Sequence, residues 1–274
     1  MTQADKAQRF RRLHDRSELL LLPNPWDAGT AKILEALGYE AMTTTSAGLA
    51  WTLGRTDGTR SVSRDEALAN AASIVDATSL PVAADLENGY GDDPSTVAQT
   101  IRLAAQAGLV GASIEDASGD PHQPIYAFDH AVERVAAAAK AARELPFPFV
   151  LVARAENYLH GVDDLDDTIR RLQEYEAAGA DVLYAPLLPD ADAIRRVCES
   201  VTKPVNVLAA GAVLSMSVRD LAALGVRRIS VGSGFARAAF GAFTQAAREM
   251  REAGSFETIR TSMTSAEITK LAAG

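Results

Sequence analysis

The stretch Pro81-Val82-Ala83-Ala84-Asp85-Leu86-Glu87-Asn88-Gly89-Tyr90-Gly91 carries the pattern that decides the fold of this chain. It starts as a short apolar run, which is typical of a buried strand, and it ends in two acids and a turn-forming sequence. Because side chains alternate between faces along a strand, Asp85 and Glu87 are expected to point the same way. Two adjacent carboxylates repel each other, so the stretch predicts a hard divalent cation such as Mg²⁺, which takes oxygen ligands.

A second acidic pair, Glu115-Asp116, directly follows the apolar run 109–114. If these two strands are neighbours in a parallel sheet, three or four carboxylates converge at one edge. Helix capping or solvated loop positions would explain either pair alone. Two pairs, each directly after a buried strand, favour a metal site.

Outward from these two strands, the chain contains about eight apolar runs, each followed by a helical segment. The runs are continuous rather than alternating, as in parallel strands that are buried on both faces. Repeated strand–helix units with short connections predict a parallel sheet, and eight of them predict a closed (β/α)₈ TIM barrel. A doubly wound sheet is the alternative, but Pro23-Asn24-Pro25-Trp26 in the first turn is unlike the glycine-rich G-x-G-x-x-G sequence. The expected strands are 19–22, 41–46, 81–85, 109–115, 147–154, 181–184, 204–208 and 228–231, with one further helix over 256–271 at the end.

Length, charge and cysteine content narrow the class of protein. The 274 residues suit a single barrel domain over 1–274, since such barrels occupy about 250 residues. The formal net charge of −9 argues against nucleic acid and anionic membranes as partners. No apolar run approaches the roughly 18 residues that cross a bilayer, and the charged segment 1–16 is not a signal peptide. The lone Cys198 excludes an intrachain disulfide and fits a reducing compartment, so we expect a cytoplasmic protein.

The active site of a barrel is built from the loops that follow its strands. Two loops, 47–62 and 117–128, are long enough to indicate function. Arg154 ends a buried strand and should face the carboxylates. It either pairs with them structurally or clamps a substrate carboxylate or phosphate with its bidentate guanidinium group. The proton carriers expected near the barrel mouth are His122, Tyr126 and Tyr90, and His160 is a weaker candidate for its border.

The sequence 85–91 resembles the D-A-D-T-G-Y-G motif of the isocitrate lyase/phosphoenolpyruvate mutase superfamily. The resemblance covers nearly the whole chain, and the remaining motifs follow in the family's order. They are the G-x-x-D of Gly54 to Asp57, the I-E-D of Ile114 to Asp116, and the A-R-x-[DE] of Ala153 to Glu156.

The resemblance implies a role for each matched position. Mg²⁺, with Mn²⁺ as the alternative, would be held mostly through waters near Asp85, Glu87 and Glu115, with Asp57 close by as a catalytic residue. The carboxylate of a 2-oxo acid, or its enolate, would bind at Thr45, Ser46 and Ala47, and Arg154 would hold the other end. The shared chemistry is stabilisation of a pyruvate-like enolate while a C–C or P–C bond breaks or forms.

The chain also departs from the family pattern. The lyases carry a K-[KR]-C-G-H motif after the I-E-D strand, and the mutases carry a Lys and an Asn there. The matching segment here, 117–124, has neither, and Glu87 replaces the family's second Asp. With no Cys at that position, His122 and Tyr90 are the catalytic candidates for proton transfer.

These observations predict a Mg²⁺-dependent lyase that cleaves a C–C bond of a small 2-oxo acid or of a 2-hydroxy or 2-oxo dicarboxylate. A phosphonopyruvate-type P–C enzyme and a non-catalytic 2-oxo-acid-binding barrel are the alternatives. A phosphonyl group would need more positive charge, for which Arg154 and Arg55 are the candidates. Related proteins exchange a C-terminal helix between subunits, so the apolar C-terminal helices predict a homodimer or homotetramer.

Overall fold

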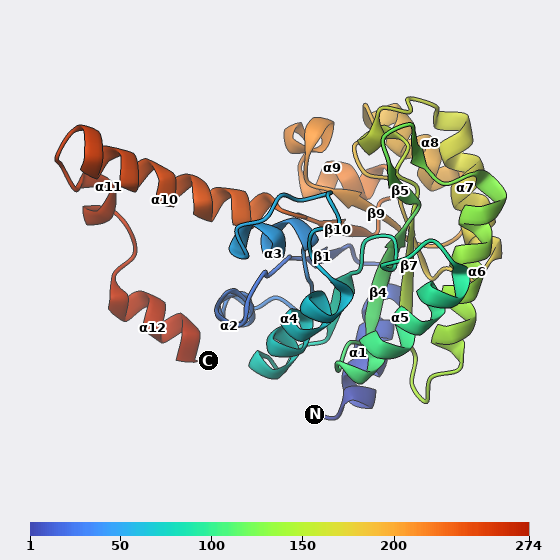
Figure 1. Cartoon of the computed structure of the whole chain (residues 1–274), viewed down its shortest axis with the longest axis horizontal. Coiled ribbons are helices and arrows are strands. Elements are labelled where there is room, and N and C mark those ends of the chain that lie inside the picture. Colours follow the sequence, from blue (N-terminus) through green and yellow to red (C-terminus); the bar gives the residue numbers. More distant parts are fainter. Residues whose placement is uncertain (274) are drawn as a thin grey trace.

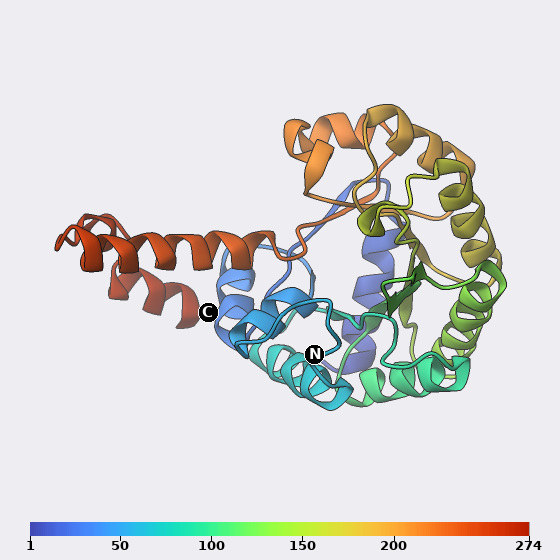
Figure 2. The same cartoon turned by 45° about the horizontal axis from the view of Figure 1, so that its top comes forward.

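In the computed structural model, which describes residues 1–273, eight parallel strands form a barrel surrounded by helices (Figure 1, Figure 2). The hydrogen-bonded order is β1–β10–β9–β8–β7–β4–β3–β2, so each barrel strand lies beside the next one along the chain. This arrangement confirms the predicted (β/α)₈ class. The barrel strands are β1 (Leu20–Leu22), β2 (Met42–Thr43), β3 (Val82–Asp85), β4 (Gly111–Glu115), β7 (Val150–Arg154), β8 (Val182–Tyr184), β9 (Val205–Leu208) and β10 (Arg228–Ser230).

Helices follow the barrel strands as predicted, with short 3₁₀ turns η1 (Tyr158–His160) and η2 (Gly211–Ser215) between strands and helices. Several begin at the capping residues that the sequence indicates. Ser63, for example, accepts the backbone N–H of Glu66, and Glu66 returns the bond to the N–H of Ser63. The helices are α1 (Gln3–Asp15), α2 (Ala28–Ala36), α3 (Ser46–Thr52), α4 (Arg64–Ala77), α5 (Pro94–Gln106), α6 (Phe128–Arg143), α7 (Leu165–Ala177), α8 (Ala191–Ser200), α9 (Val218–Ala223), α10 (Gly234–Glu252), α11 (Glu257–Arg260) and α12 (Ser265–Ala273).

The buried side chain of Asn24 joins the first strand to both of its neighbours. Its Nδ2 donates to the carbonyl oxygen of Thr44 at 2.9 Å, and its Oδ1 accepts the N–H groups of Val231 and Gly232, each at 2.9 Å. The backbone N–H of Thr43 also donates to the carbonyl of Pro23 at 3.0 Å. Asn24 therefore links the C-terminal end of β1 to the ends of β2 and β10, where the barrel closes.

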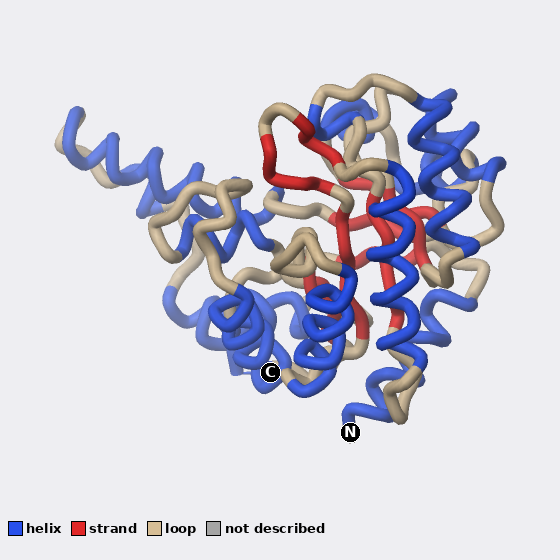
Figure 3. Tube along the Cα trace, turned by 45° about the vertical axis from the view of Figure 1, so that its right-hand side comes forward, coloured by secondary structure: helices blue, strands red, loops and turns tan. Residues whose placement is uncertain are grey.

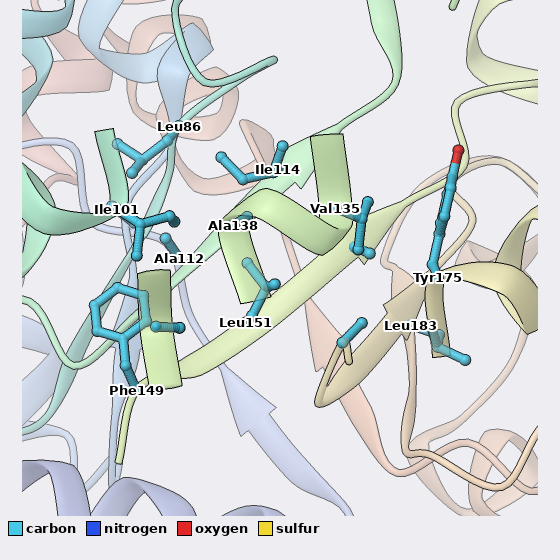
Figure 4. Close-up of a cluster of buried hydrophobic side chains, with 14 of the residues drawn as sticks. Leu86, Ile101, Ala112, Ile114, Val135, Ala138, Phe149, Leu151, Tyr175 and Leu183 are labelled. Carbon is cyan, nitrogen blue, oxygen red and sulfur yellow. The ribbon is translucent and has the colours of Figure 1, made fainter. Parts of the chain in front are cut away.

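Two apolar cores lie on opposite sides of the strands. The outer core fills the space between strands and helices (Figure 4), with Ala112, Ile114 and Leu151 pointing outward. The inner core lies within the barrel and includes Val150 and Val152 on alternate positions of β7. This alternation brings the last inward residues of three strands to the barrel mouth. Those residues are Asp85 of β3, Glu115 of β4 and Arg154 of β7.

Helix α1 closes the other end of the barrel. Its buried Ala7, Phe10 and Leu13 belong to the inner core. Gly111, at the start of β4, is required by this contact, because a Cβ there would lie 2.9 Å from the Phe10 ring and 2.8 Å from the carbonyl oxygen of Val150. The mouth at the C-terminal ends of the strands is thus the open end.

Three predicted boundaries were wrong. The segment 46–52, expected to finish a strand and enter a loop, forms α3, because the Thr45 hydroxyl accepts the N–H of Gly48. The expected loop after Glu115 is an antiparallel hairpin of β5 (Ala117–Asp120) and β6 (Gln123–Ile125), visible in red above the barrel in Figure 3. The expected last helix is divided into α11 and α12, since Thr264 and Glu267 form a separate capping box.

The C-terminal helices form an arm. Helix α10 extends away from the barrel, and α12 returns to lie against α2 (Figure 1, Figure 2). The arm exposes large apolar side chains, with 71% of Phe243, 59% of Phe256 and 54% of Ile259 accessible. Within residues 1–273, no helix is long and apolar enough to cross a membrane.

We predict that Asn24→Ala lowers the free energy of unfolding by about 2–3 kcal/mol, because it leaves three backbone groups at the ends of β2 and β10 without their side-chain partner. Chemical denaturation followed by circular dichroism measures the change. Asn70→Ala is the control, since Asn70 makes a single side-chain bond, to the carbonyl of Trp26, and should cost about 1 kcal/mol or less. Equal midpoints for Asn24→Ala and the unsubstituted protein would show that barrel closure does not depend on Asn24.

Candidate active site

Arg154 lies at the centre of the barrel mouth with carboxylates on three sides. Its Nη1 lies 3.2 Å from Asp85 Oδ1, its Nη2 lies 3.2 Å from Glu115 Oε2, and its Nε donates to Glu156 Oε1 at 2.7 Å. The guanidinium carbon also lies 4.9 Å from the centroid of the Tyr184 ring. Only 11% of the side chain is exposed. Burial opposes its charge, but the surrounding carboxylates outweigh burial and raise the pKa of Arg154 well above the usual range, so it stays charged.

Asp85 is oriented by the loop that follows β2. Its Oδ2 accepts the Ser46 hydroxyl at 2.8 Å and the Ser46 N–H at 3.3 Å. The Asp85 N–H in turn donates to Thr44 Oγ1 at 3.1 Å. These bonds bring the start of α3 against the end of β3. Thr45 caps α3 and Ala47 is buried, and the substrate-binding role of Thr45, Ser46 and Ala47 stays a prediction.

Burial dominates the titration of two of the carboxylates around Arg154. It raises the pKa of Glu115 well above the usual range, and Glu156 and Asp85 add to the effect while Arg154 opposes it. Burial likewise raises the pKa of Glu156, again against Arg154. Glu156 is inaccessible, and its Oε2 has no hydrogen-bond partner among the described residues. These acids depend on nearby positive charge to remain ionised.

Glu87 also lies at the barrel mouth, but strand alternation, which the sequence predicts as the cause, does not place it there. Strand β3 ends at Asp85, and Glu87 has a left-handed backbone with φ of 48°, so strand alternation does not set its direction. Burial, Asp85 and Asp57 nevertheless raise the pKa of Glu87 to about 7. Burial and Asp85 also raise the pKa of Asp57. Asp57, Asp85 and Glu87 are thus close enough for their charges to affect one another.

A cavity of about 280 Å³ opens at this position. Its wall combines residues of the mouth with two loops predicted to be functional, the one before α4 and the hairpin β5–β6. The lining residues are Ser46, Asp57, Gly58, Arg60, Glu87, Asn88, Glu115, Ala117, Gly119, Arg154, Leu159 and His160. A cavity of this size suits a small acid of a few carbon atoms.

The donor set suits a cation held mainly through water. Within residues 1–273, no three His, Cys, Asp or Glu side chains are close enough together to form a direct metal cage. Mg²⁺, however, is usually bound through one or two carboxylates and keeps several waters. The cavity wall includes Glu87 and Glu115, and Asp85 lies beside it. Glu87 has no ion-pair partner among the described residues, so the residues present fit such an ion.

Two of the predicted proton carriers, His122 and Tyr90, are not part of the cavity wall. His122 is exposed at the turn of the hairpin, where its N–H donates to Asp120 Oδ1 at 2.8 Å. Tyr90 lines a neighbouring pocket of about 490 Å³ that shares Arg60, Glu87 and Asn88 with the cavity. Burial and the nearby acids, Glu87 first, raise the pKa of Tyr90. The catalytic roles of His122 and Tyr90 remain predictions.

Other residues differ from their expected positions. Asp116 does not join the other acids, because the next position on a strand points outward. It accepts the Tyr175 hydroxyl at 2.6 Å and Arg171 Nη1 at 3.0 Å.

Arg55 is bound through both terminal nitrogens to Glu66 and lies outside the cavity wall. Arg60 lines the cavity, and no spacing in the sequence distinguishes it from Arg55. His160, the weaker candidate, does line the cavity.

A model of the phosphoenolpyruvate phosphomutase family matches residues 10–251. The chain belongs to this family. A protein of Mycobacterium tuberculosis (strain ATCC 25618 / H37Rv) without an assigned function is 34% identical over 82% of this chain and 81% of its own length. An oxaloacetate decarboxylase of Paraburkholderia xenovorans is 30% identical over 82% and 75%. A solved Burkholderia cenocepacia J2315 protein, described only as a lyase/mutase candidate, is 55% identical with a TM-score of 0.95, over 99% of this chain and 97% of its own.

Because the chain belongs to this family, we asked whether any cysteine could take the place of the one in the lyase motif. The hairpin β5–β6 occupies the place of that motif and contains no cysteine. Cys198 lies on α8, beside Gly225 at the opposite end of the barrel. Burial raises the pKa of the Cys198 thiol to about 11, so it stays protonated at neutral pH and suits packing rather than catalysis.

We predict that Glu87→Gln stabilises the protein at pH 8 in EDTA by up to about 3 kcal/mol. The pKa of Glu87 is near 7 in the folded chain and about 4.3 in the unfolded chain. Ionising this carboxyl therefore costs no stability below about pH 4.3, and the loss in free energy of unfolding is complete once pH has risen through the folded pKa. Urea unfolding at pH 5 and pH 8 measures this difference. Glu174→Gln, an exposed acid on α7, is the control, and an equal response of both variants at both pH values would contradict the prediction.

Proposed function

We propose that this protein is a Mg²⁺-dependent lyase that cleaves a C–C bond of a small 2-oxo acid, or of a 2-hydroxy or 2-oxo dicarboxylate, through a pyruvate-like enolate. The observation that carries the proposal is the barrel mouth, where one buried, permanently charged arginine is surrounded by carboxylates beside a small cavity. Relatives named 2-methylisocitrate lyase, oxaloacetate decarboxylase and 2,3-dimethylmalate lyase support this class of reaction.

Each residue of the site has a separate role in the proposed reaction. Arg154 supplies a fixed positive charge for an oxygen of the substrate, since its orientation is set by Glu156 and by the Tyr184 ring. Ser46 holds Asp85 in place through its hydroxyl and N–H. Positive charge aimed at an oxygen that becomes negative in the transition state lowers the barrier most when it is oriented in advance.

A bound Mg²⁺ would lie near Asp85, Glu87 and Glu115 and would supply positive charge for the developing enolate. Arg154 lies 3.2 Å from both Asp85 and Glu115, so its one positive charge is shared between these acids and Glu156. Asp57 and Glu87 have raised pKa values for the same reason, burial next to other acids. They would become fully ionised when positive charge arrives.

The test is a release assay with Mg²⁺. Oxaloacetate, isocitrate, 2-methylisocitrate, dimethylmalate, 4-hydroxy-2-oxo acids and phosphonopyruvate are supplied in turn, and pyruvate or glyoxylate is followed. We expect turnover of one C–C substrate that EDTA abolishes, and a loss of about 10³-fold in kcat/KM for Asp85→Ala and for Arg154→Met. Asp129→Ala, an exposed acid in the first turn of α6, should retain full activity.

Two outcomes would overturn the proposal in favour of the alternatives. Release of phosphate from phosphonopyruvate alone would identify a P–C enzyme. Absence of turnover for the whole panel, together with saturable binding of a 2-oxo acid by calorimetry, would identify a binding barrel. Equal loss of activity in Asp129→Ala would instead point to a general effect of removing surface charge.

We also propose that the chain assembles as a homodimer or homotetramer through its C-terminal arm. The exposed apolar side chains of α10 to α12 support this, because a monomer rarely leaves so many large apolar groups in water. Light scattering after size exclusion at micromolar concentration should give two or four times the chain mass. Phe243→Asp combined with Ile259→Asp should yield monomer, whereas a monomeric unsubstituted protein would contradict the proposal.

A further inference from the structure

Two loops meet over the cavity through one side chain. Arg60, on the loop between α3 and α4, has a left-handed backbone with φ of 53° and lines the cavity wall. Opposite it is the hairpin β5–β6, which contributes Ala117 and Gly119 to the same wall. The loop carrying Asp57 and the hairpin in the position of the lyase motif are therefore connected at Arg60.

The guanidinium of Arg60 is held in place rather than free. Its Nη2 donates to the carbonyl of Ser118, and it lies 3.5 Å from the Tyr126 hydroxyl and 3.4 Å from Asp92 Oδ1. Gly119 leaves the space for it, because a Cβ at that position would lie 2.5 Å from Arg60 Nε. Tyr126 is fixed in turn by Asp92 and by Asn88, whose Nδ2 donates to the hydroxyl at 2.9 Å.

The two arginines of the cavity wall differ in their remaining charge. Arg154 faces three carboxylates in a buried setting. Among the described residues, Arg60 forms one ion pair, with Asp92 at 3.4 Å, and the two side chains are 46% and 67% exposed. Glu87 is near enough for Arg60 to oppose the rise of its pKa. An exposed pair of this kind is screened by water and contributes little. Arg60 thus keeps positive charge at the cavity wall, and its Nε and Nη1 form no hydrogen bond among the described residues.

We propose that Arg60 binds the distal carboxylate of the substrate and so makes the enzyme specific for dicarboxylates. This inference rests on the proposed function and identifies its substrate class. Arg154 and the acids around it define the end of the cavity where the 2-oxo or 2-hydroxy group sits, and Arg60 lies on the wall formed by the two loops. A guanidinium group suits this role because it pairs with a carboxylate through two parallel hydrogen bonds.

The test compares two stable ligands that differ by one carboxylate, racemic lactate and racemic malate, by calorimetry with the full-length protein in Mg²⁺. The unsubstituted protein should bind malate more tightly than lactate. Arg60→Gln should weaken malate binding by about 10- to 100-fold, the range expected for a charge-assisted hydrogen-bonded pair, while lactate binding changes by less than about twofold. Arg60→Lys should recover part of the affinity for malate, because it restores the charge without the two parallel bonds.

The control is Arg64→Gln, which removes the same charge four residues away, where Arg64 contacts Gln99 outside the cavity wall. It should leave both affinities unchanged. An equal loss for both ligands in Arg60→Gln would assign Arg60 a purely structural role and overturn the proposal, as would unchanged malate binding. If the unsubstituted protein bound neither ligand, this inference would fail, while the release assay would still decide the proposed function. Equal binding of lactate and malate to the unsubstituted protein would remove the dicarboxylate specificity alone.

Discussion

The ion-pair cluster of Arg154 with Asp85, Glu115 and Glu156 is the constraint on which the rest of the site depends. Three buried or half-buried carboxylates at one barrel end would repel each other strongly, and burial alone raises the pKa values of Glu115 and Glu156. A single guanidinium group contacts all three carboxylates and opposes this repulsion. The same contacts hold the guanidinium of Arg154 in a fixed orientation at the cavity wall, which the proposed reaction would use.

The register of the barrel strands places the members of this cluster side by side. Glu115 of β4 pairs directly with Arg154 of β7, and β3 lies on the other side of β4. The final inward positions of the three strands therefore meet. Loops then complete the cavity. Ser46 orients Asp85 from one side, while Arg60 and the hairpin β5–β6 cover the other.

The sequence predicted much of this arrangement and missed specific parts of it. The eight strand–helix units, the open end of the barrel and the convergence of Asp85, Glu115 and Arg154 follow from apolar runs that end in charged residues. The hairpin 117–125 and the helix 46–52 were not foreseen, because a short hydroxyl cap and a tight antiparallel pair leave weak patterns. Arg60 was missed in favour of Arg55, since which of two arginines on one loop turns inward depends on partners far along the chain. Those partners are Glu66 for Arg55 and the hairpin for Arg60.

By itself, the sequence determined the fold class, the family and the strand-end residues of the site, because these depend on local hydrophobic periodicity and on motifs of fixed spacing. The tertiary structure alone decided which acids share Arg154, that Asp116 turns outward to Arg171 and Tyr175, and that Arg60 and His160 line the cavity. Such contacts join residues tens of positions apart. They follow from how strand register and loop packing place side chains in space, and sequence spacing does not encode that geometry.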